Sequence, residues 1–310
     1  MLTKYLVKRM RTGDGAPDAN LTYPPGYDEK KHEITIGCDF EYPSQYYNNF
    51  YDIYYPVGCM ERCPTILWIH GGSFVAGTRY GIANVATMLA LEGYTVIAAE
   101  YALAPEAKHP IPVRQMQELY LHLCEKNHPQ VDIQNIFIAG DSAGALIAAQ
   151  FAAVQTNAEL AQAMNIKPVI PAGTLRGAIL TCGPYDLAGI RKADSKLLRI
   201  GLWFLGRALF EGRPWHKSDD CKHSTVADHV TGDYPPTYIT DGNEGSFEVQ
   251  GRRLAMALRG KSVPVAERFF EAAQGEVPHE YLFQLADKKA QICLDEIIHF
   301  IETYKRRLLQ

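Results

Sequence analysis

Eight short runs of apolar or β-branched residues are separated, over most of this chain, by stretches long enough to form a helix. This alternation is typical of a mostly parallel β-sheet with helices on both faces, because parallel strands need a crossover connection of a dozen or more residues. The first two runs are close enough in sequence for an antiparallel connection. We therefore expect an α/β fold with eight strands, at 33–36, 50–55, 65–69, 95–99, 135–139, 177–181, 237–240 and 265–270.

Two regions interrupt the alternation, and we expect them to form a helical cap on one folded unit spanning residues 1–310. They are the polar opening up to about residue 45 and the stretch 186–233. With 47% hydrophobic residues, the chain can bury one large core. The second region contains an apolar pattern at helical spacing, compatible both with packing on the body and with a lid over a site. Its members are Leu197, Leu198, Ile200, Leu202, Trp203, Leu205, Leu209 and Phe210.

The charge pattern gives no reason to expect a nucleic-acid partner. The formal net charge is -4, and Lys and Arg are spread along the sequence without forming runs. A small, uncharged or weakly polar molecule fits this balance better. We find no apolar run suited to a secretory signal or a membrane span, so we expect a cytoplasmic protein without a membrane span. The sequence leaves a homo-oligomer open.

Seven cysteines form an odd, scattered set that does not suggest a disulfide framework. Cys59 and Cys63 are the one close pair. A metal site would need further Cys or His at ligand spacing, and the nearby His70 belongs to another motif. We therefore expect no metal.

The segment Gly140-Asp141-Ser142-Ala143-Gly144 follows an apolar run and precedes a helical pattern. A Gly-x-Ser-x-Gly sequence between a strand and a helix is typical of a nucleophile elbow, where a strained turn exposes the serine. Glycines on both sides allow strand and helix to approach closely. A chance Gly-rich turn is the alternative. We predict that Ser142 is a nucleophile.

The segment His70-Gly71-Gly72 directly follows the apolar run 65–69. Backbone N–H groups held in place can stabilise the negative oxygen of a tetrahedral intermediate. We predict an oxyanion hole formed by the amides of Gly71, Gly72 and Ala143. An ordinary glycine turn is the alternative, and His70 itself is predicted to be structural.

These motifs resemble those of the hormone-sensitive-lipase-like carboxylesterases of the α/β-hydrolase fold. The segment 101–106, Tyr-Ala-Leu-Ala-Pro-Glu, is similar to that family's Tyr-Arg-Leu-Ala-Pro-Glu segment, and the similarity runs from about residue 50 to the C-terminus. The resemblance implies hydrolysis of short-acyl esters, no cofactor, and a cap built from the N-terminal segment and an insertion after the sixth strand.

A serine nucleophile needs a base, and the α/β-hydrolase order is Ser, acid, His. His279 follows the last predicted strand, where the resembled family places its base. That family usually has a small residue after the histidine, and here it is Glu280. We predict His279 as the base. The competing histidines are His216, His223, His229 and His299.

The acid is sought after the seventh predicted strand. The family's Gly-x-Asp corresponds to Gly242-Asn243-Glu244, and glutamate can also orient a histidine, so we favour Glu244. Asp241 is the alternative, although a carboxylate at a strand end often accepts hydrogen bonds from turn amides. Glu248 is a distant third. Asp141 is predicted to accept hydrogen bonds from neighbouring loop amides.

The sequence therefore predicts a serine hydrolase that cleaves a small carboxylic ester through an acyl-enzyme. An amidase or peptidase with the same triad is one alternative. A non-catalytic ligand-binding homologue is another, although such a protein would not need a functional His279. The acyl chain length and the alcohol are left open.

Overall fold

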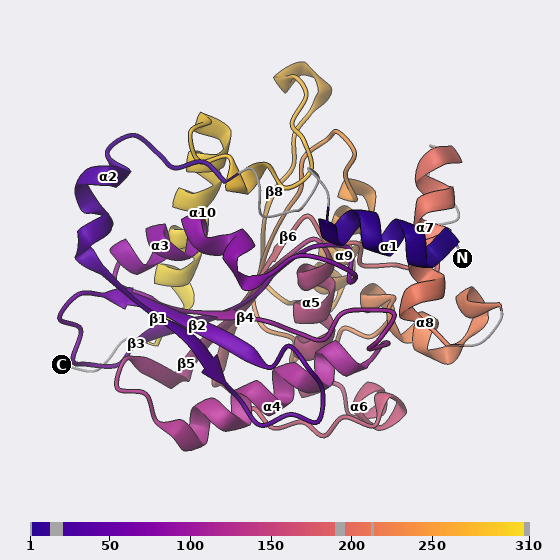
Figure 1. Cartoon of the computed structure of the whole chain (residues 1–310), viewed down its shortest axis with the longest axis horizontal. Coiled ribbons are helices and arrows are strands. Elements are labelled where there is room, and N and C mark those ends of the chain that lie inside the picture. The colour runs from indigo at the N-terminus through magenta and orange to yellow at the C-terminus, as the bar shows by residue number, and fades with distance from the viewer. Residues whose placement is uncertain (1, 13–20, 190–195, 212–213, 307–310) are drawn as a thin grey trace.

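The computed structural model describes residues 2–12, 21–189, 196–211 and 214–306 (Figure 1). Within them, one eight-stranded sheet has the order β1-β2-β4-β3-β5-β6-β7-β8. The pairs β1–β2 and β2–β4 are antiparallel, and the five remaining pairs are parallel. This confirms the predicted fold class. The strands are Ile34–Glu41 (β1), Phe50–Pro56 (β2), Cys63–Ile69 (β3), Thr95–Ala99 (β4), Val131–Asp141 (β5), Leu175–Thr181 (β6), Thr237–Thr240 (β7) and Val265–Arg268 (β8).

Helices cover both faces of the sheet (Figure 1). In β3, Leu67 and Ile69 belong to one hydrophobic core and Ile66 and Trp68 to another, because successive side chains of a strand point to opposite faces. Strands covered on both sides become apolar throughout, which is why they are visible as short runs in the sequence. The first core holds α4 (Ile111–Lys126), α5 (Ala143–Thr156), α6 (Ala158–Met164) and α9 (Glu248–Gly260), and the second holds α3 (Ala83–Leu91) and α10 (Lys288–Tyr304).

Helix α5 lies at the centre of the molecule and positions the residue that precedes it. Its sequence is rich in alanine, and its residues 143–154 are all buried. Small side chains let the helix pack closely against the sheet, where it contacts β5, β6 and β3. The turn between β5 and α5 is therefore held between two rigid elements.

The predicted cap segments have different structures. In the N-terminal segment, α1 (Leu2–Thr12) contacts α7 (Lys196–Leu209), and both lie at the same end of the molecule as α8 (Asp219–His223) (Figure 1). Helix α2 (Tyr27–Lys30) and strand β1 lie elsewhere, and β1 is one of the two edge strands of the sheet. Part of the stretch up to residue 45 therefore belongs to the body of the fold.

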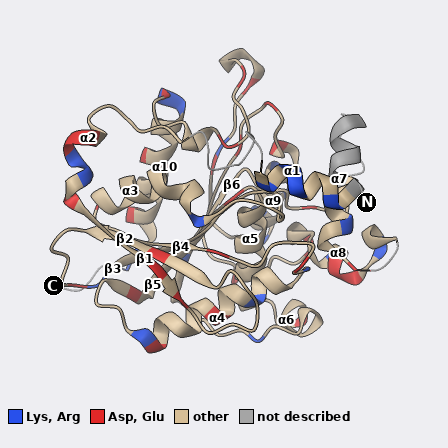
Figure 2. Cartoon of the chain, viewed as in Figure 1, with Lys and Arg blue, Asp and Glu red and all other residues tan. Residues whose placement is uncertain are grey.

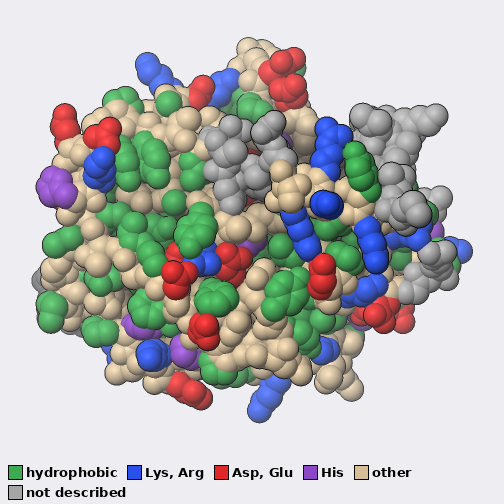
Figure 3. Space-filling model, viewed as in Figure 1, with side chains coloured by type: hydrophobic (Ala, Val, Ile, Leu, Met, Phe, Trp, Pro, Cys, Tyr) green, Lys and Arg blue, Asp and Glu red, His purple; other side chains and the backbone are tan. Residues whose placement is uncertain are grey.

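Charged side chains of both signs are distributed over many elements (Figure 2). On the face shown in Figure 3, acidic and basic side chains are interspersed with hydrophobic ones, and basic side chains also gather near α1. One of these, Arg11, donates to Glu106 at 2.8 Å and to the carbonyl oxygen of Val75 at 2.7 Å, which fixes α1 to the body. None of the described helices combines the length and apolar character needed to cross a bilayer.

Candidate active site

Ser142 occupies the sharp turn between β5 and α5. Its backbone angles are φ 48° and ψ −116°, which is a strained conformation for a residue other than glycine. Its N–H donates to the carbonyl oxygen of Thr181 at 2.9 Å, and the residue is 8% exposed. Such strain persists only where the surrounding structure enforces it, and it is common at functional sites.

The two glycines that flank the turn are sterically required. A Cβ atom on Gly140 would lie 2.5 Å from the carbonyl oxygen of Gly144. A Cβ atom on Gly144 would collide with the carbonyl oxygen of Ile69 and lie 2.5 Å from that of His70. Strand β3, strand β5 and helix α5 thus meet at distances that only glycine allows, as expected of a nucleophile elbow.

His279 lies in the loop after β8, and its Nε2 is 3.1 Å from Ser142 Oγ. This is within hydrogen-bond reach for a general base. The competing histidines have other surroundings: His216, His223 and His229 lie in the segment 214–233, and His299 lies in α10. Among the histidines in the described residues, His279 alone has a ring nitrogen within hydrogen-bond reach of Ser142 Oγ.

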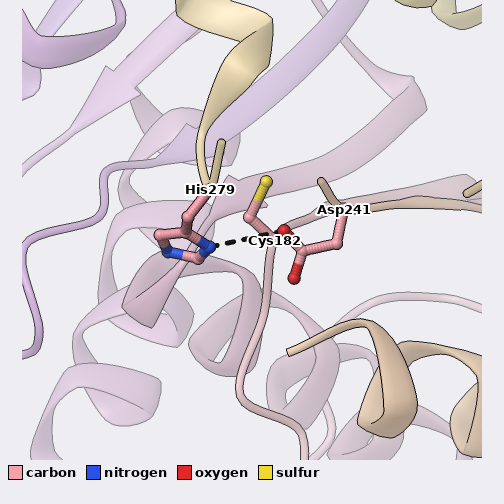
Figure 4. Close-up of side chains that lie close together, drawn as sticks. All are labelled: Cys182, Asp241 and His279. Carbon is pink, nitrogen blue, oxygen red and sulfur yellow. Dashed lines mark hydrogen bonds and ion pairs between the residues drawn. The ribbon is translucent and has the colours of Figure 1, made fainter. Parts of the chain in front are cut away.

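Asp241 follows β7 directly and faces the other side of the His279 ring (Figure 4). Its Oδ1 is 3.3 Å from His279 Nδ1. The carboxylate also accepts hydrogen bonds from the amides of Gly242 at 2.8 Å and Phe247 at 2.7 Å, and Asp241 is 2% exposed. These bonds fix the carboxylate where it can orient the imidazole.

The structure corrects the prediction that Glu244 orients His279. Glu244 meets His279 through the main chain: its carbonyl oxygen accepts from the His279 amide at 3.0 Å, and its side chain is exposed. The chain turns at Gly242 to pair with the segment before His279, which directs the Glu244 side chain to solvent. Glu248, the third candidate, pairs instead with Arg252 at 2.7 Å.

The surroundings of His279 favour its protonated form. Burial alone lowers the pKa of an imidazole, but the hydrogen bond and charge of Asp241 outweigh it, and Glu280 and Asp141 add to the effect. The pKa of His279 is therefore raised above its ordinary value. This shift makes the imidazole a stronger proton acceptor.

Cys182 packs beside Asp241 and His279 (Figure 4). Their ligand-type atoms all lie within 4.8 Å of one another, the only such trio among His, Cys, Asp and Glu of the described residues. Burial raises the pKa of the Cys182 thiol well above its usual range, and its sulfur accepts the Glu280 amide at 3.3 Å. We interpret the cluster as an acid–histidine pair packed against a neutral thiol.

The loop after β3 lies beside Ser142, but the three predicted oxyanion donors are not equivalent. The Gly71 amide donates to Asp141 Oδ2 at 2.7 Å, and Trp68 Nε1 donates to Asp141 Oδ1 at 2.8 Å. The predicted role of Asp141 as an acceptor for a loop amide is thus confirmed. Because its N–H is already bonded, the structure does not support Gly71 as an oxyanion donor, which leaves Gly72 and Ala143.

A family model described as the alpha/beta hydrolase fold matches residues 66–281. The chain belongs to this family. The α/β hydrolase is similar to esterase B from Lactobacillus rhamnosis, with 20% identity, a TM-score of 0.79, and coverage of 98% of this chain and 91% of that one.

Two other solved structures have the same architecture. A hyperthermophilic esterase from the archaeon Pyrobaculum calidifontis is 20% identical, with a TM-score of 0.70 and coverage of 97% and 90%. A bacterial heroin esterase is also 20% identical, with a TM-score of 0.71 and coverage of 99% and 90%. At these identities the likeness shows the fold.

His70 of this α/β hydrolase has the structural role predicted for it. The ring is 2% exposed, stacks on Tyr101 at 4.5 Å between centroids, and has its Nε2 3.3 Å from Glu100 Oε2. Its Nδ1 lies 2.6 Å from the carbonyl oxygen of Gly71. These contacts fix the start of the loop that carries Gly71 and Gly72.

A small apolar cavity of about 40 Å³ opens beside Ser142 in this α/β hydrolase. Two of the residues that line it, Leu205 and Leu209 of α7, belong to the apolar pattern for which the sequence analysis considered a lid role. Most of the other lining residues were not predicted from the sequence, because they lie mainly in loops, where the hydrophobic pattern has no periodicity. The lining residues are Ser73, Phe74, Ser142, Ala143, Pro184, Leu187, Leu205, Gly206, Leu209, Trp215 and Phe247.

Proposed function

We propose that this α/β hydrolase cleaves carboxylic esters with short acyl groups, through an acyl-enzyme on Ser142. The observation that carries the proposal is the continuous contact from Ser142 Oγ to His279 Nε2 at 3.1 Å and from His279 Nδ1 to Asp241 Oδ1 at 3.3 Å. A serine hydroxyl is a weak nucleophile until a positioned base removes its proton, and this arrangement supplies the base and its orienting acid.

In the first half-reaction, His279 Nε2 takes the Ser142 proton while Oγ attacks the ester carbonyl carbon. The carbonyl oxygen becomes an oxyanion that accepts hydrogen bonds from the amides of Gly72 and Ala143. The protonated imidazole then gives its proton to the leaving alkoxide, so that the ester C–O bond breaks and an alcohol departs. Asp241 holds the Nδ1 proton and stabilises the imidazolium throughout.

In the second half-reaction, His279 takes a proton from water, and the resulting hydroxide attacks the acyl carbon. The collapse of this second tetrahedral intermediate breaks the bond to Ser142 Oγ, which recovers its proton from His279. The acid product and the free serine result. Oxyanion stabilisation by the same two amides serves both halves.

The cavity beside Ser142 supports a short acyl group. At about 40 Å³ it has room for a few non-hydrogen atoms, and its walls are mostly apolar. Trp215 lines the cavity and packs closely on α7, where a Cβ atom on Gly206 would lie 2.5 Å from Trp215 Cη2. The names of the similar structures, which are esterases, point to the same reaction class.

The test is hydrolysis of p-nitrophenyl esters from acetate to long chains by wild type and Ser142→Ala. We expect turnover of the short esters and its loss in the variant, together with stoichiometric labelling of Ser142 by a short alkyl phosphonate, seen by peptide mass spectrometry. Undiminished ester hydrolysis by Ser142→Ala would overturn the mechanism. Faster turnover of the matching p-nitroanilides would favour an amidase, and neither turnover nor labelling would favour a binding protein.

A further inference from the structure

Cys59 and Cys63 lie at the connection between β2 and β3, and their sulfur atoms are in direct contact. Both are free thiols, and the distance between the two Sγ atoms is 2.9 Å, shorter than the ordinary separation of two thiols in van der Waals contact. Both sulfurs also lie near the carbonyl oxygen of Glu61, at 3.0 Å and 3.7 Å. Among the seven cysteines of the chain, this is the only pair whose sulfurs touch.

The backbone around the pair allows the sulfurs to come closer. A disulfide needs them about 2.05 Å apart, so they must approach by less than about 1 Å. Cys63 is held at the start of β3, where its amide donates to the carbonyl oxygen of Gln130 at 3.1 Å and it pairs with Val131 of β5. Cys59 lies between the strands, and its amide donates locally, to the carbonyl oxygen of Pro56 at 3.1 Å. One partner is thus fixed by the sheet, and the other can adjust.

A small reagent can reach the pair. Both cysteines are half-buried, and the three residues between them, Met60, Glu61 and Arg62, are exposed, Met60 by 84%. By contrast, Cys182, Cys221 and Cys293 are buried. A buried thiol is protected from thiol–disulfide exchange, whereas an accessible one can attack a disulfide in solution.

The two thiols differ in reactivity, because the thiolate and not the thiol attacks a disulfide. Burial, followed by the hydrogen bond with Cys59, raises the pKa of Cys63 to about 12. Cys63 is therefore almost entirely protonated at neutral pH. The first attack on an external disulfide falls to Cys59, and Cys63 acts second.

We propose that Cys59 and Cys63 are a modification site, where a small-molecule disulfide of the type of oxidised glutathione introduces an intramolecular disulfide. The Cys59 thiolate attacks one sulfur of the small disulfide, whose S–S bond breaks, so that a mixed disulfide forms and one small thiolate leaves. Cys63 then loses its proton to water and attacks Cys59 Sγ, and the second small thiolate leaves. Two protein thiols are oxidised and one small disulfide is reduced to two thiols, so the electrons balance.

The site does not depend on the proposed esterase function. The disulfide forms at the amino end of β3, whereas the loop that carries Gly71 and Gly72 follows the carboxyl end of that strand. Its formation can therefore be measured on the full chain without any substrate.

The test treats the folded, reduced protein with oxidised glutathione, blocks the remaining thiols with iodoacetamide under denaturing conditions, and digests the chain without reductant. Trypsin cuts after Arg62, between the two cysteines, so the expected product is peptide 32–62 joined to peptide 63–79. Dithiothreitol should separate the two peptides. Because peptide 32–62 also contains Cys38, the variant Cys38→Ser is the matched control and should form the same joined product. If both peptides are found separate and fully alkylated, the proposal is overturned.

Single variants made in the Cys38→Ser chain test the order of the two attacks. In Cys63→Ser, we expect a stable mixed disulfide of glutathione on Cys59, because the second thiol is missing. In Cys59→Ser, burial still keeps Cys63 protonated, so we expect at least about tenfold less adduct on Cys63 in the same time. Mass spectrometry of peptides 32–62 and 63–79 measures both adducts. Equal adducts in the two variants would overturn the proposed sequence of steps.

Discussion

Asp241 Oδ1 lies 3.3 Å from His279 Nδ1, whereas Glu244, three residues further along, contacts His279 through its main chain. The difference comes from the course of the chain after β7. Asp241 stands at the carboxyl end of the strand, and the amides of Gly242 and Phe247 hold its carboxylate toward the histidine. The segment containing Glu244 then pairs with Val277 and Pro278 and turns its side chain outward.

Replacement of Asp241 is therefore expected to damage catalysis far more than replacement of Glu244. In Asp241→Asn the amide cannot stabilise the imidazolium and favours the wrong tautomer, so we expect kcat to fall roughly 10³- to 10⁴-fold. In Glu244→Gln we expect a change within about twofold, because the side chain is exposed. Initial rates on p-nitrophenyl acetate measure both, and a larger loss in the Glu244 variant would contradict the assignment.

The pH dependence of kcat/KM should report how Asp241 changes the pKa of His279. The imidazole acts as a base when neutral, so kcat/KM is expected to rise with pH through the pKa of His279 in the free enzyme. Because Asp241 raises that pKa, the midpoint of the acid limb is expected above 6.5, the ordinary value. In Asp241→Asn, with its residual activity measured at high enzyme concentration, the midpoint should move to lower pH. A midpoint that stays fixed would show that Asp241 does not set the basicity of His279.

The inner strands of the sheet were predictable because they are largely buried on both faces. Each of the eight apolar runs overlaps a strand, and β4 and β7 match their expected bounds. Local sequence also predicted the sharp turn at Ser142, because the close packing that requires Gly140 and Gly144 leaves a recognisable motif. The antiparallel first pair followed from a short connection.

The carboxylate that contacts His279 and the hydrogen bond of the Gly71 amide were not predictable in the same way. The choice between Asp241 and Glu244 depends on how the chain turns at Gly242, where a Cβ atom would collide with the carbonyl oxygens of Val277 and Pro278, more than thirty residues away. Similarly, the Gly71 amide, which follows β3, donates a hydrogen bond to Asp141 at the end of the neighbouring strand β5. Both contacts join residues far apart in the sequence, and the spacing of residues within a motif cannot predict such contacts.

The acyl preference should respond to Leu209, a buried wall of the cavity. Leu209→Ala removes three carbon atoms, so we expect the best substrate to shift toward longer acyl chains. Each additional buried methylene is worth about 0.8 kcal/mol, or roughly fourfold in kcat/KM. The ratio of kcat/KM for hexanoate and acetate measures the shift. Leu121→Ala, at an exposed position of α4, is the matched control and should leave the ratio unchanged. Equal ratios in the two variants would place the acyl group elsewhere.

A buried charge network behind the loop is expected to dominate the stability of this part of the fold. Arg79 Nε lies 2.9 Å from Asp52 Oδ1, and Arg79 Nη1 lies 3.2 Å from Glu100 Oε1, with Asp52 fully buried. Removal of one partner leaves uncompensated charges in a poorly hydrated place. We expect Arg79→Met to lower the free energy of unfolding by about 3–5 kcal/mol, measured by urea denaturation followed by circular dichroism.

The control for this prediction is Arg259→Met, which breaks an ion pair of similar length, 2.9 Å to Glu267, at the surface. Exposed pairs gain little because water already solvates both charges and salt screens them, so the expected loss is within about 1 kcal/mol. The two variants remove the same side chain and differ in the burial of its partners. Comparable losses of the free energy of unfolding would mean that Asp52 and Glu100 become hydrated or protonated in the Arg79 variant. The buried network would then stabilise the fold no more than a surface ion pair does.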